Sequence, residues 1–260
     1  MLQLLKSTAR LLLPRTYERF RNHYKRDARL TRAIVRRQGL VVAAGPFAGM
    51  KYIADSHGSR LVPKLIGSYE LELHDVIAKL LANAPSVVVD VGCAEGYYAV
   101  GFARALPKAM VYAYDIDSGS RELCAELGAL NGIQENLVIR GECNCEELQS
   151  LPLDNALILC DCEGYEMELL CPDKAPSLKN ARLLIETHDF FVPGITPELR
   201  RRFEGTHEIR FIDVQGRDPN AYAALRGLPA TMQSLALYER DLGITPPQQW
   251  AYIEPRKGTK

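Results

Sequence analysis

Two apolar stretches in the second half of the chain, residues 156–160 and 182–185, each run into charged side chains. The carboxylates and the histidine at these two ends are Asp161, Glu163, Glu186, His188 and Asp189. Such groups can take a proton from an alcohol that attacks an electrophile. Because the carboxyl ends of parallel strands meet at one edge of a sheet, we expect these side chains to lie close together.

His188 is the first choice for a general base among these residues, with Asp161 or Glu163 as the second choice. His188 could instead be a hydrogen-bonded residue at the end of a strand. Glu163 could instead be an acid in the first turn of the following helix, where it would favour the helix dipole. The residue types alone leave both alternatives open.

A third segment, residues 86–104, supplies a strand, a turn and a helix in that order. The apolar run Val87–Val89 predicts a strand buried on both faces, and Asp90–Gly96 is too rich in glycine and small residues to continue it. Strand, glycine turn and helix bring a backbone close to a ligand at a helix N-terminus. Gly92 and Gly96 leave room for that approach because neither has a Cβ atom. We expect the ligand to be a nucleoside.

The glycine spacing and the next acid indicate which nucleoside. Gly92, Gly96 and Gly101 do not fit the G-x-G-x-x-G spacing of a dinucleotide site. Asp115 follows the next apolar run, 19 residues after Gly96. A carboxylate at that place can accept hydrogen bonds from both ribose hydroxyls.

The stretch D-V-G-C-A-E-G, Asp90–Gly96, resembles the first motif of Rossmann-type S-adenosylmethionine methyltransferases. The stretch D-x-E-G-x-E, Asp161–Glu166, is similar to that of the FkbM-type methyltransferases, which modify hydroxyls of sugars or polyketides. The resemblance covers about residues 65–190. It implies an α/β Rossmann-like methyltransferase sandwich with a mostly parallel seven-stranded sheet, helices on both faces, and S-adenosyl-L-methionine as the cofactor.

The resemblance also implies which positions form the cofactor site. Asp90 and the turn Gly92–Gly96 would shape the methionine side, Asp115 would hold the ribose, and Glu142 with Cys143 would face the adenine. Tyr69 and Glu70 belong to a Gly-Ser-Tyr-Glu stretch that similar enzymes carry at the mouth of the pocket. Their alternative is the start of a helix over 69–83, after a loop over 63–68. The full set is Tyr69, Glu70, Asp90, Gly92, Cys93, Ala94, Glu95, Gly96, Asp115, Ile116, Glu142, Cys143 and Asp161.

A divalent metal is a further expectation. Catechol-type methyltransferases hold magnesium on carboxylates that follow the fourth and fifth strands, where it orients the acceptor oxygens. The corresponding candidate ligands are Asp161, Glu186, His188 and Asp189. We expect magnesium or manganese, and the histidine favours manganese, or iron, over magnesium.

Strand and helix patterns alternate from residue 84 onward, which predicts right-handed βαβ units and a parallel sheet. The predicted strands are 87–91, 111–115, 137–140, 156–161 and 182–187, with an antiparallel pair at 208–214 and 250–254. Residues 219–247 are long for a hairpin connection and are expected to contain a helix over 230–240. We interpret them as a lid insertion in a methyltransferase domain over 61–260.

The N-terminal 60 residues form the predicted extension, a helical segment followed by a hairpin of 40–44 with 47–54. Residues 1–37 hold eleven lysines and arginines against two acids, with an apolar stripe. A basic amphipathic helix can lie on an anionic membrane surface, or pack on the domain or on a second subunit. We do not expect a nucleic-acid partner, since the rest of the chain supplies no basic groove.

At 260 residues the chain is long enough to bury a large core without stabilising crosslinks. The apolar run Leu11–Leu13 is too short for a secretory signal. Seven cysteines, an odd number, indicate reduced thiols in a cytoplasmic protein, and packing cysteines are favoured over a zinc site at Cys143-x-Cys145 and Cys160-x-Cys162.

Together these features predict a cytoplasmic methyltransferase that acts on a hydroxyl of a glycan or small metabolite. It could contact the inner face of the membrane or form a homo-oligomer. A non-catalytic nucleoside-binding scaffold and an NAD-dependent oxidoreductase are the alternatives.

Overall fold

The computed structural model describes residues 14–133, 135–240 and 249–256, and the side chains from residue 25 onward within these ranges. Its centre is a seven-stranded sheet in the order β3-β2-β1-β4-β5-β7-β6, in which only β7 runs antiparallel to its neighbours. The strands are β1 (Val87–Val91), β2 (Met110–Tyr114), β3 (Leu137–Arg140), β4 (Ala156–Cys160), β5 (Arg182–Thr187), β6 (His207–Asp213) and β7 (Gln249–Pro255). The predicted fold class and all seven strands are confirmed.

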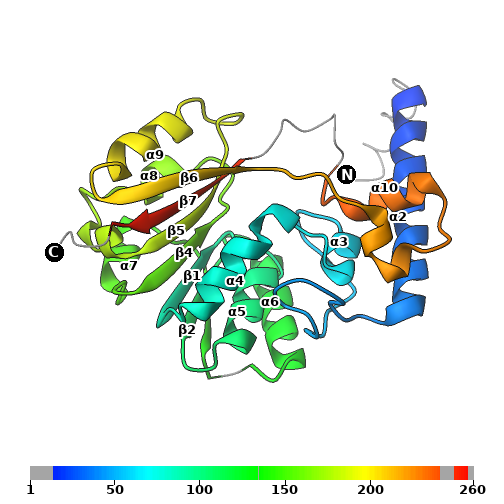
Figure 1. Cartoon of the computed structure of the whole chain (residues 1–260), viewed down its shortest axis with the longest axis horizontal. Coiled ribbons are helices and arrows are strands. Elements are labelled where there is room, and N and C mark those ends of the chain that lie inside the picture. Colours follow the sequence, from blue (N-terminus) through cyan, green and yellow to red (C-terminus); the bar gives the residue numbers. More distant parts are fainter. Residues whose placement is uncertain (1–13, 134, 241–248, 257–260) are drawn as a thin grey trace.

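Helices cover both faces of the sheet, as Figure 1 shows. Along β1, Val88 packs into one core layer and Val87 and Val89 into the other, because successive side chains of a strand point to opposite faces. One layer contains α4 (His74–Ala82), α5 (Tyr97–Ala105) and α6 (Ser118–Leu130). The other contains α7 (Cys145–Ser150), α8 (Glu166–Leu169) and α9 (Ile195–Phe203). Each strand of the centre is therefore buried on both sides, as its apolar run predicts.

The strand order reverses between β1 and β4, since the chain adds β2 and β3 on one side of β1 and then crosses to β4 on the other. Val91, the last residue of β1, is in register with Tyr114 of β2 and with Cys160 of β4. The carboxyl ends of these three strands therefore lie at the same level. In open α/β sheets this reversal point is where ligands bind.

The N-terminal extension is only partly as predicted. Helix α2 (Pro14–Gln38) begins at Pro14, where proline is tolerated in a first helical turn, and residues 1–13 lie outside the described ranges. Leu30 and Ile34 of α2 are fully buried in the core. The predicted hairpin is reduced to one antiparallel bridge, Val41 with Lys51. No helix among the described residues is both long and apolar enough to cross a membrane.

Residues 219–240, the described part of the predicted lid, pack beside α2 rather than across the sheet. They contain two short 3-10 helices (Pro219–Ala221 and Ala223–Leu225) and α10 (Ala230–Leu237), which contacts α2 and α3 (Leu61–Ile66). Figure 1 shows α10 lying against α2 at one end of the molecule. Residues 241–247 of the predicted lid lie outside the described ranges, and the domain boundary at residue 60 stays a prediction.

Candidate functional site

A cavity of about 510 Å³ opens at the carboxyl ends of β1, β2, β3 and β4. The predicted site residues that line it are Tyr69, Asp90, Gly92, Cys93, Ala94, Glu95, Asp115, Ile116, Glu142, Cys143, Asp161 and Glu163. Glu70, Gly96, Glu186, His188 and Asp189 are not among its lining residues. Four strand ends that are far apart in the sequence are thus brought to one cavity.

The glycine turn after β1 is held tightly against the end of β4. Gly92 has a φ of 83°, in the left-handed region, and a Cβ atom added to it would lie 1.7 Å from the carbonyl oxygen of Asp161. Only glycine fits this position, because any side chain would have to displace the neighbouring backbone. The turn and the Asp161 loop therefore form one rigid wall of the cavity.

Asp115 is tied to the same turn. Its Oδ2 atom accepts a hydrogen bond from the backbone amide of Ala94 at 2.9 Å, and its Oδ1 atom accepts one from the amide of Asp117 at 2.9 Å. Each carboxylate oxygen keeps acceptor capacity on the cavity side. The next residue, Ile116, lines the cavity and is 84% exposed. A planar apolar group in the cavity would cover this side chain.

Asp90 is buried beneath the turn, and neither of its carboxylate oxygens has a hydrogen-bond partner. Burial raises the pKa of Asp90 to about 7; the nearby backbone amide of Ala99 lowers it in part, and the negative charge of Asp115 adds to the rise. An unpaired buried carboxylate beside a cavity is a candidate for contact with a cationic ligand group.

Glu95 lines the cavity, but its carboxylate is already occupied. It forms a buried ion pair with Lys64 and accepts hydrogen bonds from the Tyr52 hydroxyl (2.7 Å), the Ser56 hydroxyl (2.9 Å) and the His57 amide (3.1 Å). Burial alone would raise the pKa of Glu95, but Lys64 and these hydrogen bonds lower it below its ordinary value. Its side chain anchors residues 52–64 to the glycine turn.

Tyr69 and Glu70 do not start a helix over 69–83, and residues 63–68 are not a loop. Helix α3 occupies Leu61–Ile66, a 3-10 helix follows at Leu71–Leu73, and α4 begins only at His74. Glu70 adopts a left-handed φ of 43° between them and accepts a hydrogen bond from the Tyr98 hydroxyl. Pro63 caused the error, because proline is tolerated in a first helical turn. Tyr69 lines the cavity, whereas Glu70 is buried behind it.

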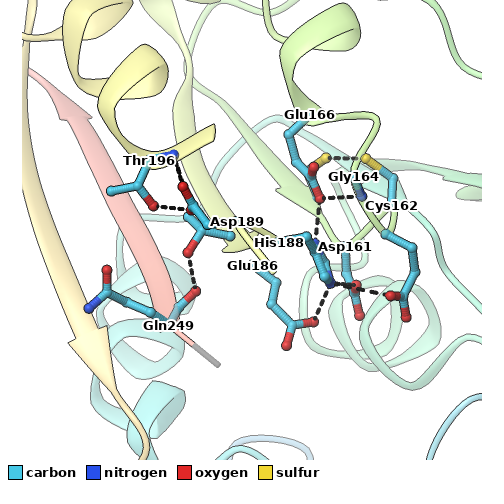
Figure 2. A network of polar contacts seen from close by, with 12 residues as sticks. Asp161, Cys162, Gly164, Glu166, Glu186, His188, Asp189, Thr196 and Gln249 are labelled. Carbon is cyan, nitrogen blue, oxygen red and sulfur yellow. Dashed lines mark hydrogen bonds and ion pairs between the residues drawn. The ribbon is translucent and has the colours of Figure 1, made fainter. Parts of the chain in front are cut away.

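His188 lies at the centre of a cluster of carboxylates, which Figure 2 shows. Its Nδ1 atom is 2.5 Å from Oε1 of Glu166. Its Nε2 atom faces Asp161 Oδ1 at 3.4 Å and Glu186 Oε2 at 3.5 Å, with Glu163 Oε2 at 3.6 Å. The predicted gathering of Asp161, Glu163, Glu186 and His188 at one edge of the sheet is therefore present.

The charge of this cluster argues against His188 as the general base. Burial lowers the pKa of the imidazole, but Glu166, Glu186 and Asp161 together raise it to about 11. An imidazole that already carries its proton at neutral pH cannot accept another. Burial and the Glu186 charge raise the pKa of Asp161 well above its ordinary value.

Glu163 is not a first-turn acid of α8, the alternative considered for it. Helix α8 begins at Glu166, and Glu163 lies before it in a left-handed conformation with a φ of 54°. Its carboxylate is half-exposed and lines the cavity. Asp161 and Glu163, the second choices for a base, are therefore the two acids of the cluster that reach the cavity.

Asp189 lies apart from the cluster, contrary to the expectation that it could be a ligand beside Asp161. Its carboxylate accepts hydrogen bonds from the hydroxyl and the amide of Thr196, at 2.5 and 3.1 Å, and closes the start of α9. The close-up in Figure 2 shows it turned toward Thr196. Within the described ranges the group able to hold a metal consists of Asp161, Glu186 and His188.

Several residues at the site were not foreseen. Arg240 lines the cavity, and its guanidinium lies 3.8 Å from Glu163 and 3.9 Å from Glu186. No motif marks it, because it comes from an irregular segment. Lys64 was missed because residues 63–68 were expected to be a loop, whereas Lys64 lies in helix α3. Glu166 belongs to the D-x-E-G-x-E stretch, which marks it as a candidate. The spacing alone did not indicate that its carboxylate would pair with the His188 ring.

Four of the seven cysteines are buried and three are partly buried. Cys143 and Cys160 are buried, and the Sγ atoms of Cys160 and Cys162 lie 3.4 Å apart. Burial raises the pKa of the Cys143 thiol to about 12. No set of three cysteines within the described part of the chain is arranged to hold a metal.

No protein-family model matches the sequence, and no curated protein matches it either. Solved structures are similar to part of this chain. A ribosomal RNA methylase from Streptococcus thermophilus is 15% identical, with a TM-score of 0.48 over 72% of this chain and 97% of that chain. A precorrin-6y C5,15-methyltransferase from Geobacter metallireducens is 12% identical, with a TM-score of 0.46 over 70% of this chain and 87% of that chain. At these values the likeness concerns the arrangement of strands and helices alone.

Proposed function

We propose that this chain is an S-adenosylmethionine-dependent methyltransferase that methylates a hydroxyl of a glycan or small metabolite. The observation that carries the proposal is the joining of Asp115 to the glycine turn: its carboxylate accepts the Ala94 amide at the edge of a cavity of about 510 Å³. This cavity lies at the reversal of strand order, where nucleotide-type ligands bind in open α/β sheets.

The residues fit the cofactor in three parts. The free acceptor positions of Asp115 suit the two ribose hydroxyls, and exposed Ile116 with Cys143 suits the adenine ring. Asp90, buried without a partner, suits the positively charged methionine end above it. When bound, S-adenosylmethionine supplies an electrophilic methyl group on a sulfonium.

The acids beyond β4 suit the acceptor. Asp161 and Glu163 line the cavity, next to the glycine turn that would carry the methionine end. Either carboxylate can take the proton of an attacking hydroxyl, and Arg240 can position acceptor oxygens, since its guanidinium also lines the cavity. In-line methyl transfer gains much of its rate from such positioning. These acids favour a catalytic role over a nucleoside-binding scaffold.

Transfer of a labelled methyl group tests this function. The protein is incubated with methyl-labelled S-adenosylmethionine and, in separate reactions, glycan fractions, small-metabolite extract and RNA. We expect label in an alkali-stable O-methyl product of the first or second reaction. Asp161→Asn should keep cofactor affinity and lose turnover.

Label found in RNA alone would contradict the proposed acceptor class. Unchanged turnover of Asp161→Asn would remove that residue from the site. Asp213→Asn serves as the control, since Asp213 lies in β6 with its carboxylate bonded to Gln249 and away from the cavity lining.

A further inference from the structure

The cluster around His188 contains four polar atoms that are buried and yet lack a hydrogen-bond partner: Asp161 Oδ1, Glu166 Oε2, Glu186 Oε2 and His188 Nε2. The other oxygen of Glu166 already pairs with Nδ1 of His188, so Glu166 lies on the far side of the ring. The remaining three atoms lie on the Nε2 side. Glu186 is 2% exposed and His188 is 3% exposed. Leaving such atoms unpaired in a protein interior costs free energy, so each needs an explanation. That these three atoms all face one another points to one shared explanation.

The three atoms surround a common point. All lie within 4.8 Å of one another, and Nε2 is 3.4 Å from Asp161 Oδ1 and 3.5 Å from Glu186 Oε2. Two ligand atoms that each lie about 2.1 Å from one ion are about 3.0 Å apart at octahedral angles and about 3.4 Å apart at tetrahedral angles. The spacing is too long for hydrogen bonds of good geometry and suits a cation between the atoms.

The outer contacts of His188 are those of a metal ligand. Its second ring nitrogen, Nδ1, is held by Glu166 at 2.5 Å, and Glu166 is fully buried. A carboxylate on the far nitrogen fixes the ring orientation and aims the other nitrogen at a metal. In Figure 2 the ring lies between Glu166 on one side and Asp161 with Glu186 on the other.

The charges around His188 also favour a cation. Four carboxylates, Asp161, Glu163, Glu166 and Glu186, lie within ion-pair distance of its two ring nitrogens. In the described part of the chain, Arg240 is the arginine or lysine side chain nearest these acids, and its guanidinium lies 3.8 Å from Glu163 and 3.9 Å from Glu186. A divalent ion that replaces the proton on His188 Nε2 would balance the negative charge of these acids, and its binding would release that proton.

We propose that Asp161, Glu186 and His188 bind one divalent transition-metal ion, with Glu166 as the residue that orients His188. Carboxylates with one imidazole nitrogen suit manganese better than magnesium, which prefers oxygen ligands alone. Because Asp161 lines the cavity, the ion lies at its wall. The binding site stands without the proposed methyltransferase function. Only its use for positioning an acceptor depends on that function.

Manganese binding by the chelator-treated protein, without S-adenosylmethionine, tests the proposal. Electron paramagnetic resonance measures the loss of the free Mn²⁺ signal on titration with protein, and pulsed measurements detect a bound histidine nitrogen. We expect one ion per chain, a nitrogen modulation, and little displacement by an equal concentration of Mg²⁺.

Mn²⁺ binding by four variants tests which residues are the ligands. Glu186→Gln and His188→Gln should abolish binding, and Glu166→Gln should weaken it by about 10- to 100-fold. Asp189→Asn is the matched control, because Asp189 follows the same strand but bonds Thr196 instead; it should bind Mn²⁺ as the wild type does.

Two results would overturn the proposal. One is an undiminished free Mn²⁺ signal with the folded wild-type protein, which would make the cluster a closed ion-pair network. The other is bound Mn²⁺ without a nitrogen modulation or with unchanged affinity in Glu186→Gln. Both measurements on the wild type remain decisive if a variant fails to fold, and neither depends on cofactor binding or turnover.

Discussion

Asp90 behaves according to its surroundings rather than its residue type. Its position in the D-V-G-C-A-E-G turn was foreseen, but its burial without any hydrogen-bond partner was not. Removing a carboxylate from water disfavours its charged form, so the pKa of Asp90 rises to about 7. Without ligand, the protein therefore holds an acid that is only half ionised at neutral pH.

Stability without ligand should fall as the pH rises because of Asp90. The folded protein keeps the Asp90 proton up to about pH 7, whereas the unfolded chain loses it near the ordinary value of about 4. Unfolding between these pH values releases a proton, so the free energy of unfolding decreases with pH. From pH 5 to pH 8 the wild type should lose about 3 kcal/mol relative to Asp90→Asn.

Urea unfolding of both proteins across this pH range measures the difference. Parallel pH profiles for the wild type and Asp90→Asn would show that Asp90 is ionised throughout and would contradict the account.

Which side chains of the site could be predicted from the sequence depends on whether their contacts follow from the strand pattern. Asp115 and Asp161 could be placed because each ends an apolar run, and the sheet brings such ends together. The ion pair between Glu95 and Lys64 could not be predicted from the sequence, since it depends on how α3 packs against the glycine turn. Arg240 belongs to no periodic pattern at all.

At the scale of elements, the junction of the β1 turn with the end of β4 determines the shape of the site. Gly92 allows the two backbones to meet, with its φ of 83° and no room for a Cβ atom beside the Asp161 carbonyl. The strands from residue 84 onward were predicted within a few residues, because their apolar runs are regular and end in turns. Helix α3 was not, because Pro63 reads as a breaker although it lies in the first turn.

Replacing Gly92 by alanine should therefore disrupt the site. The added methyl group meets backbone at 1.7 Å and cannot be relieved by a side-chain rotation, so we expect a loss of several kcal/mol of stability and of ligand binding. Gly141→Ala is the control, because nothing lies within 4 Å of a Cβ atom there and the residue also lines the cavity.

Thermal unfolding and ligand titration of the two variants compare them directly. Equal behaviour of Gly92→Ala and Gly141→Ala would show that the turn is not held as described.

At the scale of the whole molecule, the N-terminal helix is part of the fold. Leu30 and Ile34 of α2 are fully buried, and α2 contacts α3 and α10. Arg37 also donates hydrogen bonds to the carbonyl oxygens of Ala224 and Arg226. The basic stripe indicated an interaction surface, but one sequence could not show that its apolar side is covered by residues almost 200 positions later.

Substitution of Leu30 tests this packing. Leu30→Ala should lower the free energy of unfolding by about 2 to 5 kcal/mol, the usual cost of a cavity at a filled core position. Arg32→Ala, on an exposed position of the same helix, should change it by less than about 0.5 kcal/mol. Denaturant unfolding measures both, and a Leu30→Ala change no larger than that of Arg32→Ala would contradict the packing.

The membrane contact and a homo-oligomer stay predictions. Deleting residues 1–37 is no clean test of the membrane contact, because the deletion removes core residues together with the charges. Neutral replacements on the exposed basic positions would separate the two roles, with flotation on anionic liposomes as the measurement. The positions to replace are Lys25, Arg26, Arg29 and Arg36.

The central claim is that the cavity beside Gly92 and Asp115 holds the adenosyl cofactor. Isothermal titration with S-adenosylhomocysteine, and separately with NAD, tests it most directly. We expect one S-adenosylhomocysteine per chain, no binding of NAD, and a loss of about 10- to 100-fold in affinity for Asp115→Ala, since that variant lacks a charged hydrogen-bond acceptor. Binding of NAD alone, or S-adenosylhomocysteine affinity unchanged by Asp115→Ala, would contradict the account.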